Sequence, residues 1–180
     1  MYQASKSAAA PSASPFVLHC EPGAYQYTAW KGISIGVWVG QATLNAVKGL
    51  LTLGQEMHDR HPEGHSSIVF ILDKLPAPPP EARELLSRIF SARSKLACTA
   101  VILEGSGFWA SGLRAMIGNT HRAADGNVQL QVCTSVDEVL EWFPAQHART
   151  TGIQVSSEQL RAVLARAREE NAAAALRAPG

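Results

Sequence analysis

The residues with the clearest chemical potential form a glycine-containing loop, Glu104-Gly-Ser-Gly-Phe-Trp109. Glycines between an apolar run and a helical pattern let the backbone approach a small anion or a polar ligand group. Arg114 follows about one and a half helical turns later and can reach the same rim. The competing interpretation is structural: the glycines make a tight turn, Ser106 caps the helix and Trp109 packs in the core. We favour it because the third glycine and the acid of a dinucleotide-binding motif are missing.

A second cluster contains His58, His61 and His65, with Asp59 and Glu63 between them. Imidazole nitrogens are common zinc ligands, and tetrahedral sites combine several of them. However, no cysteine lies nearby in the sequence, and the Pro-Glu-Gly stretch within the cluster is typical of a loop. We therefore interpret these residues as a solvated loop and expect no metal site.

A hydrolase triad would combine Ser106 or Ser111 with His121 and Asp125. Such a triad needs a nucleophile, a base and an orienting acid. The chain has no Gly-x-Ser-x-Gly nucleophile elbow, although Gly105-Ser106-Gly107 is a truncated version of one. We expect no catalytic residues.

Four tryptophans fall in four separate predicted elements, at Trp30, Trp38, Trp109 and Trp142. They can line one apolar cavity between helices and sheet, which would suit a small hydrophobic ligand. Core packing is the more frequent fate of tryptophan at such positions. Both interpretations stay open from the sequence.

The composition indicates one compact domain with a substantial core, since 46% of the 180 residues are hydrophobic and 17% are charged. A net charge of +1 gives no electrostatic basis for binding nucleic acid or an anionic membrane. No apolar run is long enough for a membrane span. Cys20, Cys98 and Cys133 are an odd, scattered set that fits a reducing cytoplasm. No cofactor is indicated.

The short apolar run Ser67–Asp73 organises the chain, because its β-branched residues predict a strand that is covered on both faces. In the run that begins at Ile33, every second residue is apolar, which places Ile33, Ile35, Val37 and Val39 on one face. Residues 128–132 alternate and should form a half-exposed edge strand. Strands are expected at residues 16–20, 25–30, 33–39, 67–73, 96–103 and 128–132.

Helices are expected between and after these strands. One spans Thr43 to Arg60, with Leu44, Val47, Leu50, Leu51 and Met57 as its buried stripe. Others begin at Pro80, at Ser106 and at the capping box Ser135-Val-Asp-Glu138, the last of these bounded by Pro144. A final helix from Ser156 to about Leu176 has a thin apolar stripe, which predicts an arm that packs weakly or meets a partner.

The element order predicts an α/β fold with a mixed, mostly parallel β-sheet of five or six strands. Three segments add to this order: a strand ending at Gly40 before a helix, a central strand ending Phe-Ile-Leu-Asp73, and a helix running from Ser135 to Phe143. Together they resemble, distantly, the STAS (SpoIIAA-like) family of anti-sigma-factor antagonists. The resemblance implies a STAS-like domain at residues 16–147. The composition predicts a disordered leader at residues 1–15 and a linker with a C-terminal helix at residues 148–180.

STAS domains of this kind are switched by phosphorylation of a serine after the central strand. Here the corresponding loop is Lys74-Leu-Pro-Ala-Pro-Pro-Pro80, which has no hydroxyl group and few N–H groups to hold a phosphate. The phosphoserine switch therefore cannot be carried over to this chain.

Three functions follow as hypotheses. The resemblance implies a non-enzymatic, cytoplasmic regulatory module that binds a protein partner in signalling, or forms a homodimer. The alternative is a carrier or sensor of a small hydrophobic, lipid-like ligand, and the third is a small hydrolase-type enzyme. The candidate ligand- or partner-binding residues are Gly105, Ser106, Gly107, Trp109, Arg114 and Lys74.

Overall fold

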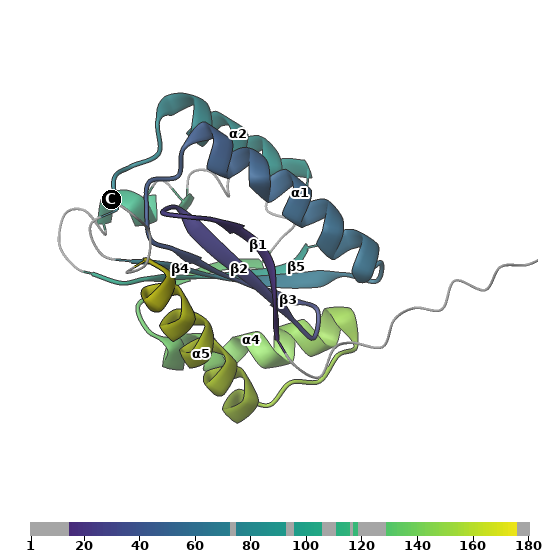
Figure 1. Ribbon diagram of the computed structural model, residues 1–180. Coiled ribbons are helices and arrows are strands. Elements are labelled where there is room, and N and C mark those ends of the chain that lie inside the picture. The colour runs from purple at the N-terminus through teal and green to yellow at the C-terminus, as the bar shows by residue number, and fades with distance from the viewer. Residues whose placement is uncertain are drawn as a thin grey trace, which may run out of the picture.

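The computed structural model describes residues 15–72, 75–92, 96–105, 111–115, 117–118 and 129–175 as a six-stranded sheet with helices on both faces (Figure 1). The strands are β1 (Phe16–Glu21), β2 (Tyr25–Trp30), β3 (Ile33–Trp38), β4 (His65–Ile71), β5 (Leu96–Leu103) and β6 (Gln129–Cys133). The helices are α1 (Leu44–Arg60), α2 (Pro80–Ala92), α4 (Val136–Thr151) and α5 (Ser157–Ala175). Residues 111–115 and 117–118, between β5 and β6, are also helical.

The strands lie side by side in chain order, from β1 at one edge to β6 at the other. β1, β2 and β3 pair antiparallel, whereas β3, β4, β5 and β6 pair parallel. The helices α1 and α2 cover one face of the sheet, and α4 and α5 cover the other (Figure 1). The connections β3–α1–β4 and β4–α2–β5 advance across the sheet in the same direction, so right-handed crossovers place both helices on the same face. The predicted mixed, mostly parallel α/β architecture is confirmed, with β6 as its half-exposed edge strand.

The central strand β4 separates two apolar cores. Ile68 and Phe70 face α4 and α5, together with Ile33, Ile35 and Val37 of β3. Val69, between them in the sequence, faces the core beneath α1 and α2. This alternation is what the pleat of a strand covered on both faces requires, so the prediction for the central strand is confirmed.

Helix α1 begins as predicted, because the Thr43 hydroxyl accepts a hydrogen bond from the backbone N–H of Ala46 at 3.2 Å. The predicted buried stripe is wrong at one position. Leu51 is 49% exposed, whereas Leu53, which the prediction omitted, is buried. Each residue turns the helix by about 100°, so the residue after buried Leu50 points away from the sheet.

Pro144 does not end the fourth predicted helix, because α4 continues through it to Thr151. The Ser135 hydroxyl caps α4 as predicted, accepting from the N–H of Glu138. Proline has no N–H to donate to the carbonyl of Leu140, one turn earlier. The Ser157 hydroxyl donates to that carbonyl instead, at 3.4 Å. The predicted boundary at residue 147 therefore falls inside a continuous helix.

Helix α5 is a layer of the fold, which corrects the expectation of a weakly packed arm. Its stripe of Leu160, Leu164 and Ala167 is buried in the same core as β3 and α4. At its far end, Arg168 donates two hydrogen bonds to the Glu104 carboxylate beyond β5, at 2.6 and 2.9 Å. A narrow apolar stripe suffices here because every residue in it reaches the sheet or α4. No helix in the described part of the chain has the length and apolar character to cross a membrane.

Candidate functional site

The glycine loop that the sequence singled out is described only in part. Gly105 is exposed and has a φ of 118°, a conformation that suits a tight turn after β5. Arg114 is half-buried, and its charge helps to lower the pKa of Glu138, after the larger contribution of hydrogen bonds from Thr134. The other candidates, Ser106, Gly107, Trp109 and Lys74, lie outside the described residues.

The histidine cluster forms no metal site: within the described ranges, no group of three His, Cys, Asp or Glu side chains is placed to hold an ion. His65 is buried within β4 and is not part of a solvated loop, which corrects that interpretation. His61 lies half-buried, and burial together with the Arg60 charge lowers its pKa. In the hypothetical triad, Ser111 is exposed, while His121 and Asp125 lie outside the described residues.

A buried chain of hydrogen bonds that sequence reasoning missed lies between the sheet and α4. His147 Nδ1 is 2.9 Å from the Ser66 hydroxyl, which also accepts from the Cys98 thiol at 3.4 Å. The other ring nitrogen, Nε2, lies 3.1 Å from the carbonyl oxygen of Lys31. The carbonyl can only accept, so Nε2 carries the proton and Nδ1 accepts from Ser66. The spacing of His147 from Phe143 and Leu140 places it on the buried face of α4, a signal present in the sequence.

This chain of groups is structural and does not form a nucleophilic site. Burial lowers the pKa of His147 to about 4 and raises the pKa of Cys98 to about 11, so both groups are uncharged near neutral pH. Ser66, His147 and Cys98 each have 0% exposure, so no substrate reaches them. They satisfy one another's hydrogen bonds inside the core.

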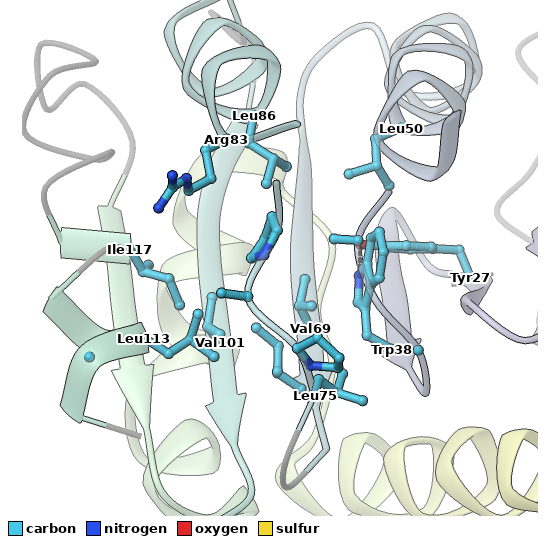
Figure 2. A pocket seen from close by; sticks show the side chains of 17 residues that line it. Tyr27, Trp38, Leu50, Val69, Leu75, Arg83, Leu86, Val101, Leu113 and Ile117 are labelled. Atoms are coloured by element: carbon cyan, nitrogen blue, oxygen red, sulfur yellow. Dashed lines mark hydrogen bonds between the residues drawn. The ribbon is translucent and has the colours of Figure 1, made fainter. Parts of the chain in front are cut away.

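A cavity of about 450 Å³ lies on the opposite face of the sheet, beneath α1 and α2 (Figure 2). Its floor is formed near the carboxyl ends of β3, β4 and β5, where Trp38, Val69, Ile71 and Val101 line it. Leu50 of α1 and Leu86 of α2 cover it, and Leu113 and Ile117 close one side. Concave, mostly apolar pockets with few polar groups are typical of small-molecule sites.

One wall of the cavity is aromatic. The Trp38 Nε1–H donates to the Tyr27 hydroxyl at 3.2 Å, so the indole has no unpaired donor toward the cavity. Tyr25 packs against Trp38 with its ring tilted by 42°, and the ring centroids lie 4.7 Å apart. Tyr27 lies directly over Gly36, where an added Cβ would come within 2.3 Å of the ring. Glycine at this position of β3 therefore makes room for the wall.

A second wall comes from the proline-rich segment after β4. Leu75, Pro76 and Pro78 line the cavity, and the Gln41 side chain donates to the Ala77 carbonyl at 2.9 Å. This bond ties the segment to the β3–α1 connection. Proline brings no N–H group, so the segment adds apolar surface with few donors. The position of these prolines, directly after a central strand, was a usable signal for this wall in the sequence.

Of the two interpretations left open for the tryptophans, the shared cavity does not hold for those that the structure describes. Trp38 lines the cavity, whereas Trp30 and Trp142 belong to the core on the opposite face of the sheet. Trp109 lies outside the described residues. Trp30 has a structural role instead, as part of the core that β3 and α5 share.

Arg83 is the one charged side chain among the described residues that line the cavity. It is the fourth residue of α2 and is exposed. Figure 2 shows it extending from α2 toward the side on which Ile117 lies, away from Trp38 and Tyr27. The cavity thus has an apolar, aromatic end and an end with a positive charge.

The fold and this site together define a mixed α/β protein with a preformed apolar cavity at the carboxyl ends of its parallel strands. Comparison with known proteins finds no matching protein-family model and no significant match among the curated proteins.

Proposed function

We propose that the protein binds a small, largely apolar ligand in the cavity beneath α1 and α2 and acts as its carrier or sensor. The single observation that carries this proposal is the cavity itself, about 450 Å³ in volume, whose described lining residues are mostly apolar. Ligand sites in proteins have volumes of roughly 300–1,000 Å³, with apolar walls and few polar groups. Well-packed cores leave few voids larger than a water molecule.

The chemistry of the cavity wall supports binding without catalysis. The described lining residues include no His, Cys, Asp, Glu, Ser or Thr, and Arg83 is their only ionisable group apart from the Tyr27 phenol. General acid–base or nucleophilic catalysis needs such groups within hydrogen-bond reach of a substrate. The Tyr27 hydroxyl is already engaged by Trp38.

The test is ligand binding in solution. Native mass spectrometry of the purified protein should show a co-purifying small molecule, and calorimetry should show binding of 1-decanol. Leu86→Trp fills the cavity from α2 and should weaken decanol binding at least tenfold. Leu51→Trp is the matched control, because Leu51 is a helical leucine on the exposed face of α1. Absence of a co-purifying molecule together with no binding of decanol or decanoic acid would overturn the proposal.

A second candidate is the STAS-like regulatory module that the sequence suggests, acting through a protein partner or as a homodimer. One observation favours it: β1 is an edge strand and carries Val17, which is 55% exposed. An open edge with exposed apolar side chains can pair with a strand of another chain. Sedimentation velocity of the wild type and of Val17→Lys tests this candidate. A monomer in both cases would count against a homodimer.

A further inference from the structure

We infer that the ligand of this cavity is an amphipathic monocarboxylic acid whose carboxylate binds Arg83 while its apolar body enters the cavity. This inference rests on the proposed function, because it names the chemical class of the ligand for the same cavity. Its basis lies in the lining residues that the structure describes: one positive charge at one end of the cavity, and apolar and aromatic walls elsewhere.

Arg83 is available for a ligand. Among the residues that the structure describes, its guanidinium forms no ion pair and no side-chain hydrogen bond. The adjacent acid Glu84 is paired with Arg88, further along α2. A cation near the first turn of a helix also lies against the helix dipole, which favours anions there. Fold stability therefore gives no reason for an arginine at this position, whereas an anionic ligand does.

The charge balance favours a head group with a single negative charge. A guanidinium presents parallel N–H donors that match the two oxygens of a carboxylate. One guanidinium neutralises one carboxylate. A doubly charged phosphate would keep an unbalanced charge, because Arg83 is the one charged side chain among the described residues that line the cavity. A cationic head group would be repelled by Arg83.

The volume of the cavity, about 450 Å³, lies within the range of small-molecule sites. The cavity is partly open, so a ten-carbon chain is a suitable apolar body to test. With its carboxylate at Arg83, the chain runs between Leu86 and Val101 toward Val69 and Trp38 (Figure 2).

Calorimetry with three probes that share a ten-carbon chain tests the inference: decanoic acid, 1-decanol and decyltrimethylammonium, at low ionic strength and below their solubility and micelle limits. In the wild type, decanoic acid should bind about tenfold more tightly than decanol, because a charge-assisted hydrogen-bonded pair is added. Arg83→Gln should reduce the affinity for the acid to that for the alcohol. It should leave decanol binding within about twofold, because Arg83 is exposed.

Arg88→Gln is the matched control, since it removes the same charge from the exposed face of the same helix. It should leave the affinities for all three probes unchanged. Arg83→Lys should retain part of the preference for the acid, because it keeps the charge and loses the paired donors. Decyl phosphate, added as a fourth probe, should bind more weakly than decanoic acid.

The failures of the two proposals are distinguishable. Equal affinities for acid and alcohol in the wild type would overturn the carboxylate inference and leave the proposed function standing. A preference for the acid that survives in Arg83→Gln would overturn the assignment to Arg83. Tighter binding of the cationic probe or of decyl phosphate would overturn the charge argument. No binding of any probe would overturn both the inference and the proposed function.

Discussion

The hydroxyl of Ser157 donates a hydrogen bond to the carbonyl of Leu140 at 3.4 Å, and this is the carbonyl for which Pro144 has no N–H. The first residue of α5 therefore supplies the donor that is missing inside α4. A proline in the middle of a helix commonly costs about 3 kcal/mol, partly through the lost hydrogen bond. Ser157 offsets part of this cost and joins the two helices at the same point.

This relationship predicts a coupling between Pro144 and Ser157. Ser157→Ala should lower the free energy of unfolding by about 0.5–1 kcal/mol in the wild type, because it removes a net hydrogen bond. In a Pro144→Ala background the same substitution should have almost no effect, since the backbone N–H of the introduced alanine can donate to the Leu140 carbonyl. Urea unfolding of the four proteins of this double-mutant cycle measures the coupling. Equal costs of Ser157→Ala in both backgrounds would contradict the role of Ser157.

The buried His147 predicts a loss of stability in weak acid. Its pKa is about 4 in the folded protein, below the ordinary value of 6.5, mainly because burial disfavours the charged ring. The unfolded chain therefore binds the proton more readily, so stability is full above pH 6.5 and falls as the pH decreases toward 4. The loss is roughly 3 kcal/mol. Urea unfolding across this pH range measures it.

A His147→Leu variant serves as the comparison. It should be less stable than the wild type near neutral pH, because Ser66 and the Lys31 carbonyl lose their partner, but its stability should fall less on acidification. His61 contributes in the same direction, since its pKa is also lowered by burial and by Arg60. An unchanged pH dependence in His147→Leu would assign the effect to other groups.

Gly36 predicts a link between the sheet and the cavity wall. In Gly36→Ala the new methyl group would lie 2.3 Å from the Tyr27 ring, which must then move and lose its hydrogen bond from Trp38. We expect a loss of about 1–3 kcal/mol in stability and weaker decanol binding. Gly112→Ala is the control, because Gly112 also lines the cavity, has no atom within 4 Å of its added Cβ, and is helical. It should be neutral or stabilising by up to about 1 kcal/mol.

The packing of α5 predicts a large cost for a core substitution in that helix. Leu164 has 0% exposure, so Leu164→Ala should destabilise the protein by about 2–5 kcal/mol through lost burial and a cavity. Leu51→Ala, at an exposed leucine of α1, should cost less than about 0.5 kcal/mol. Thermal and urea unfolding measure both variants. Similar small effects would mean that α5 packs loosely after all.

The sequence predicted the fold well because apolar periodicity is a local property. The six strands, their order along the chain and the capped starts of α1 and α4 all follow from residues within a few positions of one another. The errors arose where a distant residue decides the outcome. Pro144 is accommodated inside α4 by Ser157, which is 13 residues later in the chain. Whether the narrow apolar stripe of α5 can hold that helix on the sheet depends on its partners in β3, more than 100 residues earlier.

The cavity was harder to predict, because a void depends on how distant elements pack and leaves no pattern in any one of them. Besides the prolines after β4, one further signal was available. Trp30 pairs with Ile33 across the β2–β3 hairpin and so shares its face, whereas Trp38, an odd number of residues after Ile33, must face the other side. The alternation of side chains along the strands therefore places the two tryptophans on opposite faces of the sheet. Trp38 is the one on the face that α1 covers.

The chain-order arrangement of the sheet has a consequence for folding during synthesis. Every strand pairs with its neighbour along the chain, so the sheet can grow strand by strand as the nascent polypeptide emerges. One apolar face of β3 has no such early partner, because α5 covers it. The separation in sequence is large: Lys31, just before β3, donates a hydrogen bond to Gln159 of α5, 128 residues later. This face stays open until α5 has been made. Folding on the ribosome therefore ends with a long-range docking step, even though the sheet itself is built from neighbours.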